Sequence, residues 1–248
     1  RAAQGSGEDL PVGLENIQTI IGTGGIGGGV IYRLEGEHAL GKGESRAARR
    51  LKQRDFCKQH IVLHYVARAF RGLRRKVRIF PIGAVGADAT GRQMVRLMGS
   101  VGMDPQFIKE EKGTPTLFSV CYQYPGGEGG NFTQSPSASD RVSLAHIRRA
   151  WIKTGGAESV IALPEVPLSS RALLLKLGRK QGAFTAASFT SGEMERVIKT
   201  KILKWVDLLS LNADEATMLA GDQSFHGAAT LNRAFRRAIL FQPRQKII

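Results

Sequence analysis

Short apolar runs alternate with longer amphipathic segments over the carboxyl-terminal half of this 248-residue chain. The apolar runs are typical of buried strands, and the segments between them carry apolar residues at a helical spacing. The predicted strands are residues 159–163, 183–187 and 206–211. The predicted helices are residues 144–153, 169–181, 193–205 and 213–220. Strands that alternate with such helices indicate βαβ units and a parallel sheet, so we expect an α/β fold.

The amino-terminal half has the same two patterns, less regularly spaced. Its predicted strands are residues 17–21, 30–34, 77–81 and 116–124, and its predicted helices are residues 55–73 and 92–101. Two polar segments, residues 36–51 and 125–139, are predicted to be loops. No internal repeat or low-complexity tract divides the chain, so we expect a single domain over residues 1–248.

The composition is that of a globular protein, with 42% hydrophobic and 23% charged residues. No apolar run approaches the roughly 20 residues that span a bilayer, so we expect no membrane partner. The first residues lack the apolar core of a signal peptide. Two cysteines, Cys57 and Cys121, favour a reduced protein over a disulfide scaffold. We therefore expect a cytoplasmic protein.

The charge is less ordinary, because 36 Lys and Arg residues against 21 Asp and Glu residues give a net charge of +15. Such a balance favours anionic partners, which include nucleic acid, membrane surfaces and phosphorylated small molecules. The basic residues gather at 46–54, 71–78 and 233–237. None of these clusters is interleaved with aromatic residues, and no helix-turn-helix or zinc-finger spacing accompanies them. Solvated basic faces explain the clusters more simply than a nucleic-acid site.

Two glycine-rich strings imitate nucleotide-binding motifs. Gly22-x-Gly24-x-x-Gly27 matches the dinucleotide fingerprint, but a strand and not a helix is predicted to follow it. A tight turn, or a close approach of the backbone to a ligand, fits this string better. The string Gly36 to Gly43 resembles a phosphate-binding loop, but Gly43 stands where the metal-binding hydroxyl belongs.

The predicted helix at 55–73 places Cys57, His60 and His64 on one face. These residue types can bind zinc. The helix lacks the glutamate of a metalloprotease motif, and the sequence offers no obvious fourth ligand. Buried or partly buried histidines are the alternative interpretation.

The predicted strand at 206–211 ends in Asn212, and Glu215 follows one helical turn later. In open α/β sheets, ligands bind just beyond the carboxyl ends of the strands. Asn212 and Glu215 there could hold a hydrated Mg²⁺ ion beside a phosphate, because Mg²⁺ takes oxygen ligands and keeps its waters. The alternative is a helix cap followed by a surface carboxylate.

Four segments in this order resemble the ribokinase-like, PfkB-type carbohydrate kinases. They are Gly83-x-Val-Gly86-x-Asp88-x-x-Gly91, Ala162-Leu-Pro-Glu165-Val-Pro167, Asp207-Leu-Leu-Ser-Leu-Asn212-Ala-Asp-Glu215-Ala, and Ser224-Phe-His-Gly-Ala-Ala229. The resemblance covers most of residues 77 to 240. It implies a three-layer sandwich with a central, mostly parallel sheet and a small β lid formed by strands near 30–34 and 116–124. Lids of this kind often mediate dimers in the family, so a homodimer is expected.

The activity that the resemblance implies is the ATP-dependent phosphorylation of a hydroxyl group on a sugar or nucleoside. ATP and Mg²⁺ are the implied cofactors, with Asn212 and Glu215 at the metal and Asn212 and Gly227 at the nucleotide. Asp222 is the implied proton acceptor. The residues expected around the substrate are Glu165, Asn131, Gly86, Asp88, Lys58, His60 and His64.

The chain also departs from the family. The family's Gly-Gly-x-x-Asn helix start is absent, and the predicted helix from Asp55 stands in its place. Residues 185–190 lack the usual Asp or Asn. The family has a long region between its Asn-x-x-Glu helix and its catalytic aspartate, whereas Glu215 and Phe225 are only ten positions apart.

Two explanations of the short spacing stay open. A segment that holds the nucleotide-binding strands and the true proton acceptor is missing near residues 222–224. Alternatively, the chain is continuous, and Asp222 is a displaced proton acceptor or none at all. In the second case the protein is an inactive, kinase-like binding protein or a basic module associated with nucleic acid.

Overall fold

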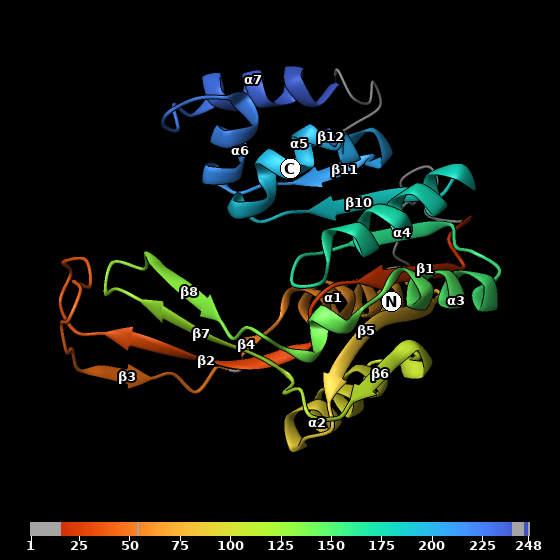
Figure 1. Ribbon diagram of the computed structural model, residues 1–248, viewed down its shortest axis with the longest axis horizontal. Helices are drawn as coiled ribbons and strands as arrows, with labels where there is room; N and C mark the ends of the chain where they lie inside the picture. Colours follow the sequence, from red (N-terminus) through yellow and green to blue (C-terminus); the bar gives the residue numbers. More distant parts are fainter. Residues whose placement is uncertain (1–15, 54, 240–245, 248) are drawn as a thin grey trace, which may run out of the picture.

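A computed structural model describes residues 16–53, 55–239 and 246–247, which form two sheets (Figure 1). The large sheet has the strand order β12-β11-β10-β9-β1-β5-β6, and its paired strands are parallel. Its strands are β1 (Thr19–Thr23), β5 (Arg78–Gly86), β6 (Ile108–Glu111), β9 (Ser159–Ala162), β10 (Phe184–Ser188), β11 (Leu208–Ser210) and β12 (Lys246–Ile247). The predicted α/β fold with a parallel sheet is confirmed.

Helices cover both faces of the large sheet. The core on one face contains Val160 and Ala162 of β9, packed with residues of α3 (Leu144–Thr154) and α4 (Leu168–Lys180). Ile161, which alternates with them along β9, belongs to the core of the opposite face. That second core is built with α1 (Lys58–Gly72) and α2 (Ala89–Ser100). The alternation follows from the period of two in a strand, and it gives the three layers that were predicted.

The small sheet projects to one side of the large sheet (Figure 1). In it, β2 (Gly27–Leu34) pairs in parallel with β7 (Leu117–Gln123), and β8 (Gly129–Thr133) pairs antiparallel with β7. The short strands β3 (Ala48–Arg50) and β4 (Asp55–Phe56) pair with β2. The two segments expected to form a lid are therefore neighbouring strands of one small sheet.

Two predicted loops contain strands. Residues 36–51 include β3, and residues 125–139 include β8. Tyr124 donates its backbone N–H to the carbonyl oxygen of Glu128 at 2.7 Å, which closes a hairpin between β7 and β8. The glycines that suggested a loop serve this turn, where Gly127 has a φ of 95°.

Three predicted boundaries are corrected. Residues 55 and 56 pair with β2, so the helix predicted from Asp55 begins at Lys58. The helix predicted over 193–205 divides into α5 (Met194–Lys199) and a 3₁₀ turn, because Lys201 between them has a φ of 55°. The strand predicted over 77–81 extends to Gly86, so the glycine-rich segment from Gly83 begins within β5.

The carboxyl-terminal helices are α6 (Ala213–Ala220), as predicted, and α7 (Ala228–Ile239). Among the residues that the structure describes, no helix is both long enough and apolar enough to cross a membrane. The expectation about a signal peptide concerns residues 1–15, which lie outside the described residues.

Candidate active site

A polar cavity of about 700 Å³ lies where β9, β10 and β11 end. The loops after these three strands supply Glu165, Thr190 and Asn212 to its wall. Other lining residues come from α1, the β8 strand and its exit, the residues around α5, and α6: Lys58, Asn131, Thr133, Gln134, Ser135, Ser137, Asp140, Ser191, Glu193, Arg196 and Glu215. Carboxyl ends of parallel strands are the usual ligand-binding edge of such sheets.

Glu165 occupies an unusual backbone conformation in the wall of this cavity. Its φ is 74°, in the left-handed region that residues with a side chain rarely adopt. Its Oε2 accepts a hydrogen bond of 3.3 Å from the backbone N–H of Lys58. Burial raises the pKa of the Glu165 carboxyl above its ordinary value. A strained residue with a perturbed pKa in a cleft is a candidate for function.

The glycine-rich string after β1 allows a close approach to Glu165. The N–H of Gly25 donates to the carbonyl oxygen of Pro164 at 2.9 Å. A side chain at position 25 would collide with Oε2 and Cβ of Glu165. The glycine is therefore needed for close packing against Glu165, and the strand β2 that follows the string agrees with the rejection of a dinucleotide motif.

Asn212 and Glu215 form a capping box at the start of α6. The Glu215 N–H donates to Oδ1 of Asn212 at 2.8 Å, and the Asn212 N–H donates to Oε2 of Glu215 at 2.9 Å. The side-chain Nδ2 of Asn212 donates to Oε1 of Glu215 at 3.1 Å. Burial raises the pKa of the Glu215 carboxyl. The helix cap is thus confirmed, but Glu215 is buried and is not the surface carboxylate of that alternative, and both residues line the cavity.

The oxygen atoms of Asn212 and Glu215 could hold Mg²⁺ indirectly, through the water molecules bound to the ion. Oδ1 of Asn212 already accepts a helix N–H, and both oxygens of Glu215 already accept hydrogen bonds. Each carboxylate oxygen keeps a lone pair that could accept a hydrogen bond from metal-bound water. The pair is therefore suited to hold a hydrated Mg²⁺ ion through its waters. In the described part of the chain, no group of three or more His, Cys, Asp and Glu residues could hold a metal ion.

The zinc interpretation of Cys57, His60 and His64 is wrong on that ground. The ring of His60 stacks on Phe56, with 4.4 Å between centroids, and on His64. Burial lowers the pKa of His60 to about 4, so the ring is neutral at pH 7. Neither His60 nor His64 lines the cavity, whereas Lys58 at the start of the same helix does.

Gly86 and Asp88 also lie outside the cavity lining. Asp88 caps α2 by accepting from the N–H of Gly91 at 2.7 Å. It accepts from the N–H and the hydroxyl of Thr116 at 2.8 and 2.7 Å, and the Gly86 N–H donates to the same hydroxyl at 2.9 Å. These bonds tie the end of β5 to the segment that enters β7.

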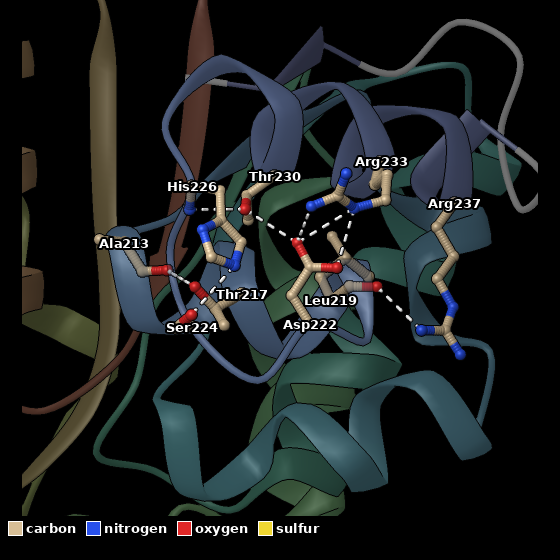
Figure 2. Close-up of polar contacts among 9 residues, drawn as sticks. All are labelled: Ala213, Thr217, Leu219, Asp222, Ser224, His226, Thr230, Arg233 and Arg237. Atoms are coloured by element: carbon tan, nitrogen blue, oxygen red, sulfur yellow. Dashed lines mark hydrogen bonds and ion pairs between the residues drawn. The ribbon is translucent and has the colours of Figure 1, made fainter.

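Asp222 and Gly227 are not brought to the cavity either. Asp222 follows Gly221, the left-handed residue that ends α6, and its N–H donates to the Thr217 carbonyl at 3.0 Å. Figure 2 shows its carboxylate between Thr230 and Arg233 of α7, which donate to it at 2.8 Å and at 2.5 to 3.1 Å. These contacts join α6 to α7.

The sequence did not predict the ion pair that holds Glu193 in the cavity wall. Arg171 of α4 is fully buried and forms an ion pair with Glu193. The second carboxylate oxygen of Glu193 accepts from the N–H of Thr190 at 3.0 Å, which completes a capping box. The Thr-x-x-Glu spacing at 190–193 is a recognisable sequence signal for such a box. The partnership with Arg171 has no local signal.

No protein-family model and no curated protein matches the sequence. Solved structures do match. Ribokinase from Giardia lamblia superposes with a TM-score of 0.72 at 17% identity, over 93% of this chain and 69% of that one. Ribokinase from Arabidopsis thaliana, complexed with ribose and ATP, gives 0.60 at 16% identity over 91% and 69%. A PfkB protein from Polaromonas sp. gives 0.60 at 15% identity over 90% and 73%. The chain therefore has the ribokinase-like fold of the PfkB-type carbohydrate kinases.

Proposed function

We propose that this protein takes part in the ATP- and Mg²⁺-dependent phosphorylation of a hydroxyl group on a sugar or nucleoside. The observation that carries the proposal is the common cavity of Glu165, Asn212 and Glu215 at the carboxyl edge of the large sheet. Three side chains from separate loops could have pointed to separate surfaces. Asn131 and Lys58 reach the same cavity from the small sheet and from α1.

The lining suits a molecule with many hydroxyl groups. Uncharged hydrogen-bonding side chains dominate the wall near the small sheet, namely those of Asn131, Thr133, Gln134, Ser135 and Ser137. Such groups can donate and accept, as sugar hydroxyls do. The Glu165 carboxyl adds two oxygens that can accept hydrogen bonds from such hydroxyls.

In this proposal the two ends of the cavity have different roles. Glu165 and Asn131 orient the acceptor, and Asn212 and Glu215 hold the waters of the metal ion. When bound, Mg²⁺ neutralises charge on the transferred phosphoryl group. Lys58, the first residue of α1, adds a positive charge to the cavity wall, which would attract the phosphate groups of the nucleotide. The small sheet closes over the acceptor and excludes water, and it is our candidate for a homodimer contact.

Asp222 is poorly placed to act as the proton acceptor. Its carboxylate is occupied by Arg233 and Thr230, and it is absent from the cavity wall. The solved relatives above are longer, since this chain covers 69 to 73% of them. We propose that the proton acceptor and much of the nucleotide site come from residues that have no counterpart in the described chain. The hypothesis of a missing segment near residues 222–224 therefore stays a proposal.

Because Arg233 and Thr230 already bind the carboxylate of Asp222, a second function is also a candidate. In it, the protein is an inactive binding protein that holds the acceptor without phosphorylating it. One experiment separates the two. A panel of sugars and nucleosides is tested for binding by calorimetry and for Mg²⁺-dependent ATP consumption. Phosphorylation supports the kinase, and binding without ATP consumption supports the binding protein.

The control is a pair of matched variants. Glu165→Gln should weaken acceptor binding about tenfold or more, because hydrogen bonds to a charged or polarised group contribute about 1.5–3 kcal/mol. Glu195→Gln, the same change on an exposed residue of α5, should leave binding unchanged. Both candidate functions are wrong if no sugar or nucleoside binds, or if Glu165→Gln and Glu195→Gln change the acceptor affinity equally.

A further inference from the structure

A second cavity, of about 630 Å³, opens at the amino end of β5. The carboxyl ends of α1 and α2 form its sides, and we call it the basic pocket. Phe70 of α1, Arg78 of β5 and Gly99 of α2 are among its lining residues. Since β5 runs from Arg78 to Gly86, its rise of about 3.3 Å per residue places the pocket about 26 Å from the carboxyl edge of the sheet. It is therefore separate from the candidate active site.

Five of the lining residues are cationic and none is acidic. Within residues 16–53, 55–239 and 246–247, no carboxylate forms an ion pair with Arg71, Arg74 or Lys76. The guanidinium of Arg78 is held in place, since it donates to Oγ1 of Thr19 at 3.0 Å and lies 5.7 Å from the centre of the Phe80 ring. Arg71, Arg74 and Lys76 thus bring positive charge to the pocket that no ion pair offsets in the described part of the chain.

Helix ends alone do not account for this charge. Cations near the carboxyl end of a helix offset its negative dipole, which amounts to roughly half an elementary charge per helix. The ends of α1 and α2 together supply about one negative charge by this measure. Arg71, Arg74 and Lys76 alone supply three positive charges that no ion pair offsets among the described residues. The excess favours an external anion.

The backbone shapes the pocket as well. Arg74 has a φ of 54°, in the left-handed region. Its N–H donates to the Arg71 carbonyl at 3.0 Å, and the N–H of Arg75 donates to the Phe70 carbonyl at 2.9 Å. This tight turn brings the end of α1 and the start of β5 to one cavity. On the opposite wall, a side chain added at Gly99 would meet no atom within 4 Å, so space is open there.

We propose that the basic pocket binds the phosphate groups of a nucleotide-sized molecule. Arginine presents a planar set of donors that matches phosphate geometry. Apolar side chains of Phe70, Val77 and Val101 line the same cavity and can contact the remainder of such a ligand. The pocket is open to solvent, but no row of aromatic rings lines it, which favours a small molecule over a single nucleic-acid strand.

The test measures the binding of tripolyphosphate and of ADP by calorimetry, in EDTA to remove metal-dependent binding. The double variant Arg71→Ala/Lys76→Ala removes two pocket charges. The control Arg148→Ala/Lys153→Ala removes the same two residue types from exposed positions on α3. A third variant, Gly99→Trp, obstructs the pocket without any change of charge. ADP binding is repeated with Asn212→Ala, so that any ADP held at the candidate active site is counted separately.

We expect the pocket double variant to weaken both ligands at least tenfold and the α3 control to weaken them less than twofold. Gly99→Trp should weaken ADP more than tripolyphosphate, because the larger ligand needs more of the cavity. Equal weakening by the two double variants would indicate diffuse charge attraction and overturn the proposal. Absence of binding at millimolar ligand would do the same. Tighter binding of a mixed-sequence RNA, lost in the pocket double variant, would replace the small molecule with nucleic acid.

Discussion

The backbone N–H of Lys58 donates a hydrogen bond of 3.3 Å to Oε2 of Glu165, which lies 107 residues further along the chain. The bond joins the first residue of α1 to the loop after β9, and so connects the helix on one face of the large sheet to the cavity at its edge. The donor belongs to the backbone, so this contact depends on where α1 begins and not on the identity of residue 58. The three-residue correction to the start of α1 therefore matters for the site.

The first prediction concerns the charge of Glu165. Burial raises the pKa of its carboxyl in the folded protein, so the folded state binds the proton more tightly than the unfolded state. The carboxyl then contributes stability at pH values below its unfolded pKa, and this contribution is lost as the pH rises through the folded pKa. Glu165→Gln removes the titration. The variant should gain stability relative to the original protein between pH 4 and pH 8, as measured by urea unfolding.

Its control is Glu195→Gln, which changes an exposed carboxyl. The stability difference between this variant and the original protein should not change over the same pH range. A difference for Glu165→Gln that is flat with pH would contradict the proposed effect of burial.

The second prediction concerns Gly25. A methyl group at this position would collide with Glu165 and with Leu117. Overpacking of this kind destabilises by about 1–3 kcal/mol, so Gly25→Ala should lower the free energy of unfolding by that amount. Gly72→Ala at the end of α1 meets nothing within 4 Å and should stabilise by about 0.4–1 kcal/mol. Denaturant unfolding of the two variants gives the comparison, and equal effects would refute the packing argument.

The sequence predicts best where the determinants are local. The bounds of α6 were predicted correctly because Asn212, Glu215 and Gly221 mark its two ends with capping chemistry. The end of β5 was missed for the opposite reason. Gly83 and Gly86 suggest a turn, but they are strand residues at which added side chains would strike Ile26 and Thr116. Distant neighbours, and not turn geometry, determine their identity.

The same distinction between local and distant determinants applies to the residues of the candidate site. Asn212 was placed at the carboxyl edge because ligands bind where parallel strands end, and the resemblance to the carbohydrate kinases placed Glu165 in the same site. The position of Asp222 depends on Arg233, eleven residues away on another helix, and Asp88 depends on Thr116. A motif match carries no information on such tertiary partners, and for these two residues it predicted cavity contacts that the structure does not show.

The third prediction concerns the buried pair of Arg171 and Glu193. Glu193→Gln removes the ion-pair partner of the Arg171 guanidinium, which is 0% exposed. An unpaired buried charge destabilises by about 3–5 kcal/mol. Arg171→Met leaves Glu193, whose side chain is 26% exposed and can be hydrated, so its effect should be smaller. Urea unfolding of both single variants checks the order, and a larger effect of Arg171→Met would contradict it.

The fourth prediction concerns the contact between α6 and α7. The hydrogen bonds from Arg233 and Thr230 hold the pKa of Asp222 below its ordinary value, so the contact contributes stability above the unfolded pKa and is lost as the pH falls through the folded pKa. Asp222→Asn should therefore lower the melting temperature at pH 7, and the difference from the original protein should shrink below pH 4. Arg233→Gln should have a similar effect, and the double variant should add little, because the two residues share one interaction.

The same two variants test the role of Asp222 in catalysis. If Asp222 only joins the helices, Asp222→Asn and Arg233→Gln should reduce acceptor binding and ATP consumption to the same small extent, in proportion to the loss of folded protein. A proton acceptor behaves differently. Its loss lowers the rate constant by orders of magnitude while acceptor affinity stays constant. Such a loss with Asp222→Asn alone would return Asp222 to the active site and would require α7 to move away from α6.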